Sequence, residues 1–503
     1  MSPALRTFIL FTTIVWIGVT SIFSQSILDQ KVGIHGNLPL LEVIDSLQND
    51  FQIAYSPDKL ANSEIRIKRG STLRDLLTQL NQKKILSYSI EGNQIVIIPY
   101  VWRSYTINGI LKDVETGEHI IGAAIQVVGT SLGTITNGYG YYSLTLKEGD
   151  YQLAFSHIGY KAHLLDLSLD GNTYLKVSIS PLIFALDEVE VNAITSDINL
   201  AETIPSINRI YINKADGQIP YFLGEVDVIQ NALLQPGIRA IGEDASGIHV
   251  RGGGIDQNLT LLDEATIYNP NHFYGLVSVF NPEAVNDIRI MKGYIPPTYG
   301  GRASSVIEVR QKEGNANKFS YSGGIGFLSA RGLIEGPLKK DKSSFLLSGR
   351  QSLLNLSIDD FASTSVRRDR FRFQDINFKM NSKPNSRNTY YFSAYYGNDR
   401  NDIGLNSVRR WGNRMVNFRW NHLFTPRIFS NLSAFVSQYN YRIESEEEPG
   451  AFVGRSRITD FSIKSDISFL LNPTNEIQFG FNSILHRLSP GSREPLDPTS
   501  NST

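Results

Sequence analysis

The 503-residue sequence contains no cysteine. This absence excludes disulfide bonds, thiolate zinc sites, cysteine nucleophiles and a lipid-modified N-terminal cysteine. An excess of either charge is also missing, because 48 Lys and Arg oppose 49 Asp and Glu and leave a net charge of −1. A balanced charge gives no electrostatic footprint of general nucleic-acid binding. We therefore expect no nucleic-acid partner.

Long apolar runs are absent from the sequence after its first 24 residues. Residues 1–24 are typical of an export signal: Arg6 supplies the positive charge, 8–19 the apolar run, and Ser24-Gln25 a cleavage point. The alternative is a membrane anchor, but the run is short for a hydrocarbon core of ~30 Å. No later segment resembles a transmembrane helix, so entry into a membrane would require a closed β-barrel.

The length predicts several domains, since a chain of this size is too long for one hydrophobic core. Residues 26–100 predict a small α/β module. Apolar residues recur at helical spacing in "LPLLEVIDSL" and "TLRDLLTQL", and Thr72 and Asp75 form a candidate capping box before the second helix. "ILSYSIEGNQIVIIP" predicts a hairpin that turns at Gly92-Asn93. Nothing in this module indicates catalysis, and we interpret it as a docking module.

Residues 104–180 contain short apolar strands separated by Gly, Asn and Asp turns, which predicts a small β-sandwich. Within it, "GTSLG" at 129–133 fits the Gly-x-Ser-x-Gly pattern of a nucleophilic serine. That mechanism requires a strand, a sharp elbow and a helix. The residues that follow, "TITNGYGYYSL", indicate strand and turn, so we expect a hairpin loop rather than a nucleophile.

Residues 220–313 mix short strands with glycine clusters, including Gly252, Gly253 and Gly254. A triple glycine can indicate a phosphate-binding loop. Here no Lys-Ser or Lys-Thr follows, and "IDQNLTLL" predicts a strand, so no helix N-terminus is available for phosphate. We expect instead a compact α/β unit whose glycines permit tight turns and close packing.

From about Phe319 the sequence predicts a series of longer strands. In "MVNFRWNH", Val416, Phe418 and Trp420 alternate with polar residues, and "FSIKSDISFLL" and "EIQFGFNSIL" repeat the pattern. A soluble sandwich would turn the polar face to water, whereas an outer-membrane barrel would turn the apolar face to lipid. Alternation by itself does not separate the two.

The connections between these strands favour the barrel. Short turns at "KKDKS", "SKPNSRN", "FTPR" and "NPTNE" alternate with longer polar segments at "LSIDDFASTSVRRDR", "NDRNDIGLNSVRR" and "ESEEEPGAFVGRSR". Short turns on one rim and long loops on the other are typical of outer-membrane barrels. With membrane-crossing strands of ~10 residues, we expect about eight strands over 319–503.

These motifs resemble the TonB-dependent outer-membrane receptors and transporters, in the multidomain form common in Bacteroidetes. "VRGGGIDQNLTLLDEATIYNP" and "NPEAVNDIRIMKGYIPPTYGGRASSVIEVRQKEG" resemble two parts of the family's plug domain. The resemblance implies a secretin/TonB short N-terminal domain over 26–100, a carboxypeptidase-regulatory-like, prealbumin-type β-sandwich over 104–180, an α/β plug over 200–313 and part of an antiparallel transmembrane β-barrel over 319–503.

The resemblance also implies the site residues and partners. "LDEVEVNA" at 186–193 lies where such receptors have a TonB box, a segment that an inner-membrane TonB protein binds as an added strand. The TonB-binding residues would be Leu186, Asp187, Glu188, Val189, Glu190 and Val191. Arg251 and Arg302 are the expected plug-to-barrel anchors, although ordinary surface ion pairs are an alternative for both.

In such a receptor a ligand binds outside the cell, and the energised pull of TonB on the box remodels the plug so that the ligand enters the periplasm. The ligand class (siderophore, glycan, peptide or similar) stays open. The N-terminal domain suggests signalling to an anti-sigma regulator, and a surface lipoprotein is another possible partner. We expect no cofactor.

Three further expectations complete the interpretation. Receptors of this family close a barrel of many more strands, so we expect the sequence to be C-terminally incomplete. An adhesin or assembly protein that binds in the outer membrane without transport is the alternative function. Enzymatic activity is not expected, because no His-x-x-x-His pair with an intervening glutamate is present.

Overall fold

The computed structural model describes residues 27–56, 64–91, 94–100, 102–182, 207–211, 221–222, 224–240, 247–353, 370–404, 406–446, 451–472 and 475–496. Within these ranges, no helix is both long enough and apolar enough to cross a membrane. The chain divides into two units, 1–104 and 105–503, which are described separately.

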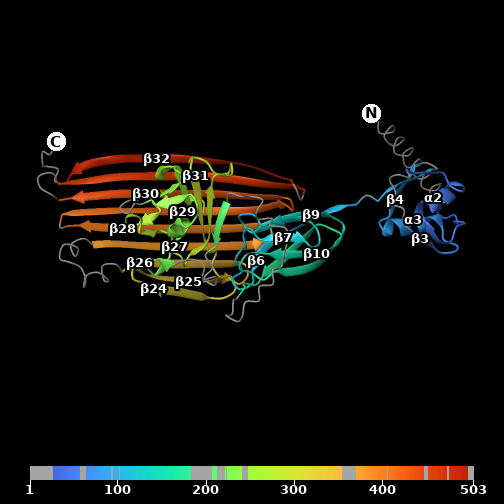
Figure 1. Cartoon of the computed structure of the whole chain (residues 1–503), viewed down its shortest axis with the longest axis horizontal. Coiled ribbons are helices and arrows are strands. Elements are labelled where there is room, and N and C mark those ends of the chain that lie inside the picture. The colour runs from blue at the N-terminus through green and yellow to red at the C-terminus, as the bar shows by residue number, and fades with distance from the viewer. Residues whose placement is uncertain are drawn as a thin grey trace, which may run out of the picture. The chain divides into compact units, whose positions relative to one another are not determined.

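Among its described residues, the first unit packs the two short helices α2 and α3 against small sheets (Figure 1). Its elements are β1 (Gly36–Pro39), α2 (Leu40–Gln48), β2 (Ile53–Ala54), β3 (Glu64–Ile67), α3 (Leu73–Gln82), β4 (Leu86–Glu91) and β5 (Gln94–Pro99). The predicted capping box is confirmed: Asp75 donates its backbone N–H to Thr72 Oγ1, and the Asp75 carboxylate accepts from the Thr72 N–H. β4 and β5 pair as the expected hairpin, while its turn at Gly92-Asn93 lies outside the described residues.

The second unit begins with a sandwich of two sheets, whose strand orders are β11-β10-β7-β8 and β12-β6-β9. The strands are β6 (Ser104–Asp113), β7 (Ala124–Val127), β8 (Gly133–Ile135), β9 (Tyr141–Lys147), β10 (Gly149–Ser156), β11 (His163–Leu169) and β12 (Thr173–Ile179). Their inward apolar side chains form one buried cluster that includes Tyr142 and Phe155. The "GTSLG" stretch joins the antiparallel strands β7 and β8, so the predicted hairpin loop is confirmed.

The glycine-rich segment forms the α/β unit expected for a plug. Its five-stranded sheet has the order β13-β22-β23-β18-β19. The elements are β13 (Ile207–Tyr211), β14 (Tyr221–Phe222), β15 (Glu225–Val226), α4 (Val228–Leu233), β16 (Ile238–Ala240), β17 (Ile248–Val250), η3 (Ile255–Gln257), β18 (Asn258–Leu262), β19 (Ala265–Thr266), β20 (Asn271–His272), η4 (Phe273–Gly275), β21 (Val277–Ser278), β22 (Val285–Lys292) and β23 (Ser305–Gln311). After the triple glycine the chain makes one 3-10 turn and then enters the predicted strand β18.

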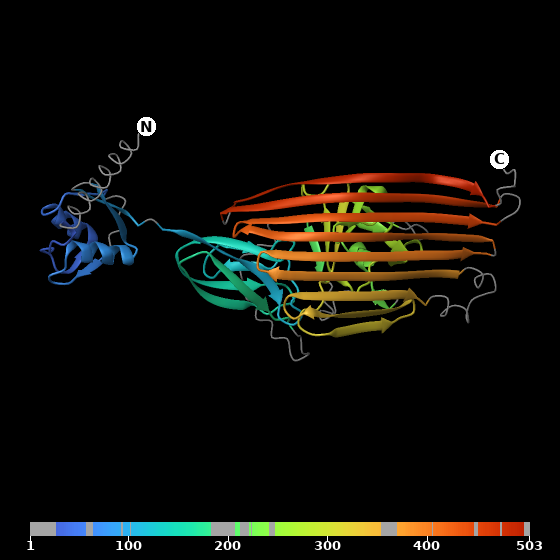
Figure 2. The same ribbon diagram turned by 180° about the vertical axis from the view of Figure 1, so that it is seen from behind.

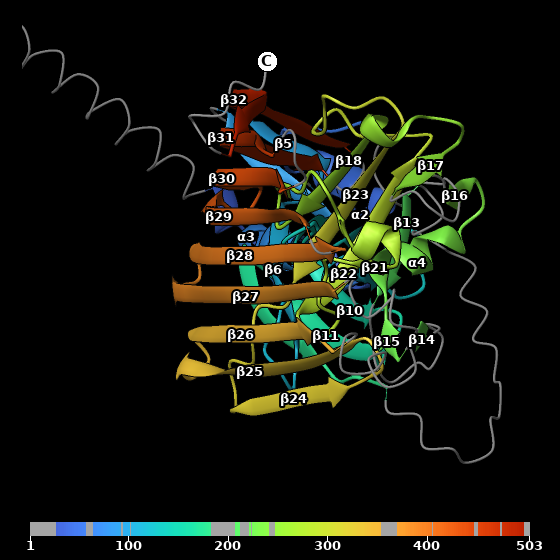
Figure 3. The same cartoon turned by 90° about the vertical axis from the view of Figure 1, so that its left-hand side faces the viewer.

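A nine-stranded antiparallel sheet follows, and we call it the wall (Figure 2). Its strands pair in chain order: β24 (Ser320–Ile325), β25 (Ser329–Lys339), β26 (Ser343–Ser352), β27 (Arg370–Asn385), β28 (Asn388–Ile403), β29 (Ser407–Thr425), β30 (Ile428–Ser445), β31 (Phe452–Asn472) and β32 (Asn475–Pro495). The sheet curves around the plug, which lies against one of its faces (Figure 3).

The wall differs from expectation in the length of its strands. The sequence predicted about eight strands of ~10 residues, whereas β27 to β32 run for 16 to 21 residues and the wall has nine strands. The longer polar segment expected around 398–410 is mostly strand, since β28 ends at Ile403 and β29 begins at Ser407. Polar residues extend the ladder here because neighbouring strands satisfy each other's backbone hydrogen bonds beyond the apolar band.

The wall is apolar outside and polar inside, as a lipid-facing sheet requires. On β29, Val416 and Phe418 are each 47% exposed, whereas the alternating residues Asn417 and Arg419 are buried against the plug. The same alternation exposes Phe461 and Ile463 on β31 and buries Ser462 and Lys464. A soluble sandwich would bury the apolar set. The ambiguity left by the sequence is therefore resolved in favour of a barrel wall.

Candidate functional site at the interface between plug and wall

The tip of the β18–β19 hairpin is one of the places where the plug contacts the wall. Its two turn residues, Asp263 and Glu264, have φ angles of 47° and 77°, as two-residue hairpin turns of the primed type require. Both acids are buried, and a non-glycine residue at positive φ persists only when surrounding contacts hold it. The Asp263 carboxylate lies 3.0 Å from Lys379 Nζ on β27, and both side chains are almost inaccessible to solvent.

Glu264 extends this contact toward two other parts of the chain. Its carboxylate accepts a hydrogen bond of 2.9 Å from Tyr139 Oη in the sandwich and one of 3.4 Å from Asn431 Nδ2 on β30. Burial alone would raise the pKa of Glu264, but the nearby cations Lys464 and Arg419, with Arg310, lower it below the usual value. The hairpin tip therefore presents an ionised Glu264 to a cationic patch, beside the ion pair of Asp263 with Lys379.

A second buried contact centres on His272 at the end of β20. Its Nδ1 lies 2.7 Å from Asp399 on β28, and its Nε2 lies 3.0 Å from Asp375 on β27. Arg350 on β26 donates to Asp375 at 2.7 Å and to the carbonyl oxygen of Ser278 at 2.6 Å. Tyr395 completes the group by donating its hydroxyl to Asp375 at 2.7 Å. One plug imidazole thus joins carboxylates on two neighbouring wall strands.

The charges of this cluster balance. Burial alone would lower the pKa of His272, but the carboxylates of Asp375 and Asp399 outweigh burial and raise it to about 9. At neutral pH two cations, His272 and Arg350, therefore face two carboxylates. Removing one partner of such a buried group typically costs about 3–5 kcal/mol, because it leaves an uncompensated charge.

A third contact lies at the first wall strands. Glu283, in the loop before β22, accepts a hydrogen bond of 2.7 Å from Ser322 Oγ on β24, and Arg331 Nε on β25 lies 3.4 Å from its carboxylate. Glu283 is buried. The three contacts together tie the plug to β24, β25, β26, β27, β28 and β30.

The plug sheet also holds a charged group on its strands β22 and β23. Glu308 lies 3.0 Å from Arg310 and 3.5 Å from Arg289. Burial would raise the pKa of Glu308, but Arg310 and Arg289 lower it to about 2. Arg310 also donates to the carbonyl oxygen of Gly138, so this group bridges the plug and the sandwich.

The glycine motif expected from the sequence has a steric role in the plug. Gly252 has a φ of +82°, and a Cβ added to Gly253 would lie 2.3 Å from Ser304 Oγ. Ser304 in turn donates to the carbonyl oxygen of Val250 at 2.7 Å, which closes the turn against the segment before β23. Gly254 is the residue before the 3-10 turn.

The two arginines predicted as anchors lie elsewhere on the plug. Arg251 packs its guanidinium beside Gly293, and Arg302 Nη1 donates to the carbonyl oxygen of Gly301 at 2.9 Å. Their anchoring role stays a prediction, and the plug-to-wall ion pairs seen among the described residues come from other side chains. The predicted TonB-binding residues 186–191 lie outside the described residues.

The sequence-based predictions did not include the contact residues His272, Asp375, Asp399, Arg350 and Lys379. A signal was present for the wall residues, because Asp375 and Lys379 fall on the polar face of the alternating stretch "DINFKM". A charged residue on a face that must be buried predicts a partner. Nothing in the sequence identified that partner as a histidine about a hundred residues earlier. Among the described residues, no group of three or more His, Cys, Asp or Glu side chains is placed to hold a metal.

Comparisons with known proteins identify two domains in this chain. Residues 107–191 match the model of a CarboxypepD_reg-like domain, and residues 226–307 match that of the TonB-dependent receptor plug domain. The TonB-dependent receptor SusC of Bacteroides thetaiotaomicron is 27% identical over 277 residues, which is 52% of this chain and 26% of that protein. The chain therefore spans about a quarter of this curated relative.

Solved structures with a similar chain course include P. aeruginosa FpvA bound to heterologous pyoverdines, at 12% identity and a TM-score of 0.44 over 93% of this chain and 57% of that one. The FrpB iron transporter of Neisseria meningitidis has the same identity and TM-score over 57% of this chain and 49% of that one. The domain matches confirm the family resemblance found in the sequence and agree with a location in the outer membrane.

Proposed function

We propose that this chain, which contains a CarboxypepD_reg-like domain and a TonB-dependent receptor plug domain, binds a ligand outside the cell and imports it into the periplasm on energy transmitted by TonB. The observation that supports the proposal most directly is the buried ionic contact between plug and wall. It closes the inner face of the wall with a separate domain. Its hydrogen bonds and ion pairs lie beside apolar contacts, such as those of the plug core with Met415 and Phe435 of the wall.

The position of the predicted TonB box favours mechanical opening. The box at 186–193 precedes β13, which is the edge strand of the plug sheet and pairs only with β22 in the sheet as described. A force applied to the chain before Ile207 reaches this five-residue strand first. Peeling an edge strand breaks its hydrogen bonds one after another, which requires less force than shearing them together. Segments of low local stability are the ones that open in such transitions.

The opening would then reach the interface in steps. Strand β22 is bonded to β23, and β23 is bonded to β18, whose hairpin tip holds Asp263 and Glu264 against the wall. The polar contacts of this interface can re-form with water as they separate, so they cost less to break than apolar contacts of equal area. Signalling through the N-terminal domain to an anti-sigma regulator would use the same change, and we include it in the proposal as a secondary role.

Photo-crosslinking from position 189 tests the proposal without knowledge of the ligand. A crosslinking amino acid in place of Val189 should capture the C-terminal domain of TonB in cells, because the box is expected to add to a sheet edge of that domain. The matched control places the crosslinker at Leu164, a residue of β11 that is 57% exposed, where no capture is expected.

The alternative function, an adhesin or assembly protein that transports nothing, predicts a different outcome. Such a protein has no use for TonB, so position 189 would give no more product than position 164. That result would overturn the transport proposal while leaving the outer-membrane location intact.

A further inference from the structure

Five arginines form one transverse row across five neighbouring wall strands. The strand registers place them directly opposite one another in the order Arg372 on β27, Arg400 on β28, Arg410 on β29, Arg442 on β30 and Arg455 on β31. Like charges that face each other across paired strands destabilise a sheet. An uninterrupted row of this kind therefore requires anions beside it.

The row lies on the outer face of the wall. On β29, Arg410 is an even number of positions from Val416 and Phe418, which are exposed, and an odd number from Trp411, which is buried with residues of the plug. No register irregularity separates these positions in the pairing of β29 with β28 or β30 before Leu423. Because the strand registers pair the five arginines directly with one another, the other four also lie on the outer face.

The row lies beyond the edge of the outward apolar band. The outermost exposed apolar residue is Ile376 on β27, Val416 on β29, Val436 on β30 and Phe461 on β31. The arginine of each of these strands lies four to six positions from that residue, toward the same rim. This separation is ~13–20 Å along the strand at ~3.3 Å per residue, and less in height because barrel strands tilt. The short turn at Pro426-Arg427 lies at one rim of the wall, and the arginines lie toward the other rim. In barrels of this type the rim away from the short turns is the extracellular one.

The carboxylates beside the row are too few to balance it. Asp402 is shared by Arg372 and Arg400, Glu444 is shared by Arg410 and Arg442, and Glu494 pairs with Arg455 at 3.2 Å. Within the described part of the chain, five cations of the row thus share three ion-pairing carboxylates. The five arginine side chains are 35–52% exposed, so their guanidinium groups are accessible from outside.

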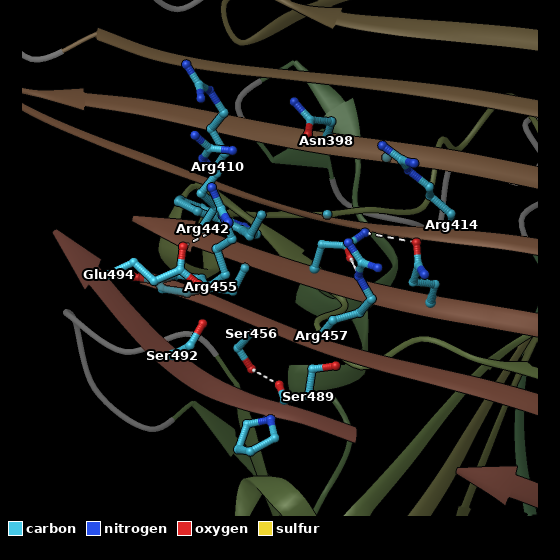
Figure 4. Close-up of a pocket in the computed structure, with 17 residues that line it drawn as sticks. Asn398, Arg410, Arg414, Arg442, Arg455, Ser456, Arg457, Ser489, Ser492 and Glu494 are labelled. Atoms are coloured by element: carbon cyan, nitrogen blue, oxygen red, sulfur yellow. Dashed lines mark hydrogen bonds and ion pairs between the residues drawn. The ribbon is translucent and has the colours of Figure 1, made fainter. Parts of the chain in front are cut away.

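A groove of about 630 Å3 opens over the last three arginines of the row. Figure 4 shows Arg410, Arg442 and Arg455 gathered on its lining beside Glu494, with Ser489 and Ser492 from β32. Arg457, one further position along the outer face of β31, donates to Asn440 at 2.9 Å and adds a cation to the lining. The groove therefore combines an excess of positive charge with neutral hydrogen-bonding groups.

We propose that this arginine row binds the phosphate groups of outer-leaflet lipids and fixes the barrel at the membrane surface. A guanidinium donates two parallel hydrogen bonds to a phosphate, and one phosphate between two arginines removes their mutual repulsion. The lipid's acyl chains would lie along the exposed apolar band of the same face. A soluble ligand on its way past the plug would meet the opposite face of the wall, which is why the row fits a lipid better than an imported anion.

Native mass spectrometry of the full chain in detergent tests this binding. The probes are diphosphoryl lipid A and the same lipid without phosphate. Wild-type protein should retain the phosphorylated lipid roughly ten-fold more than the phosphate-free one. The triple variant Arg410→Gln, Arg442→Gln, Arg455→Gln should lose this preference, and the Arg→Lys triple variant should keep part of it, because charge remains while bidentate geometry is lost.

The matched control removes the same charge at the other rim. Lys339, Lys340 and Lys342 are exposed at the short turn between β25 and β26, and their triple change to Gln should leave lipid retention unchanged. Equal retention of the two lipids by wild-type protein would overturn the proposal, and this comparison needs no variant to fold. Retention by the Arg→Gln variant at the wild-type level would overturn it too. Binding of a heparin-derived oligosaccharide in place of the lipid would assign the row to a soluble polyanion instead.

Discussion

At the residue scale, the plug is held by side chains whose charge depends on their surroundings. His272 is the clearest case, because an imidazole enclosed by protein would ordinarily be neutral. Two wall carboxylates keep it protonated, with a pKa of about 9. At neutral pH the contact therefore has the strength of a charged pair. It is lost when His272 loses its proton, as the pH rises through about 9.

Raising the pH should release the β20–β21 segment from the wall. A histidine whose pKa is raised above 6.5 contributes stability that is fully present below pH 6.5 and is lost as the pH rises through about 9. Hydrogen–deuterium exchange of 271–278, corrected for intrinsic exchange rates, should show protection up to about pH 8 and a loss above about pH 9.

The variant His272→Gln provides the control for this step. It should lower the local opening free energy at neutral pH by about 3–5 kcal/mol, because two buried carboxylates lose a cation. Its exchange should then show no step near pH 9. An identical step in the variant would assign the transition to another group.

At the element scale, the stability of the wall strands depends on which face, and which height in the membrane, each residue occupies. Val416 and Gln438 both point outward, but Val416 lies in the apolar band and Gln438 lies on the next row toward the polar rim, opposite Arg414. The neighbouring Arg414 stacks over Tyr396 with its guanidinium 5.2 Å from the ring centre, as expected where the apolar band ends.

Arginine should be tolerated at one of these positions and not at the other. Val416→Arg should destabilise the barrel more than Gln438→Arg, because position 416 lies within the edge of the apolar band and position 438 lies one row beyond it, where a cation should cost about 0–1 kcal/mol. Guanidinium unfolding from lipid vesicles measures both. Equal costs would mean that the outward face is not lipid-facing.

At the scale of the second unit, the sandwich packs on the plug and wall. Tyr139 and Tyr141 stack on Phe429 of β30 with ring centres 5.4 and 5.2 Å apart, and the hydroxyl groups of Tyr141 and Ser143 both donate to the carbonyl oxygen of Pro426 at 2.7 Å. Arg427 Nε donates to Thr106 Oγ1 at 2.9 Å. The predicted TonB box follows this domain in the chain, so a pull on the box loads the sandwich contact as well as the plug.

Phe429→Ala should therefore loosen the sandwich. Truncation of a buried aromatic side chain at the centre of a contact typically costs about 2 kcal/mol or more. Hydrogen exchange in β9 should rise accordingly, roughly 30-fold at 2 kcal/mol. Phe424→Ala is the control: Phe424 lies on the adjacent strand and is 54% exposed, so its removal should leave β9 protected.

The sequence by itself determined the kinds of element and the faces they expose. The alternation around Val416, the capping box at Thr72 and the hairpin at 129–133 are all local patterns, and local geometry fixes them through the two-residue period of a strand and the hydrogen bonds of a first helical turn. The plug motifs were likewise recognisable because their glycines and the Leu-Leu-Asp turn occupy fixed neighbouring positions.

Only the tertiary structure decided which charges meet. His272 is 127 positions from Asp399 and 103 from Asp375, and the hydrogen bonds between them exist because plug and wall are pressed together. The arginine row likewise depends on four strand registers, each set by pairing that single-sequence reasoning cannot fix. Short-range periodicity can be recognised in the sequence, because it depends on neighbouring residues. The balance of a buried charge depends on residues that are far apart in the sequence and meet only in the folded protein.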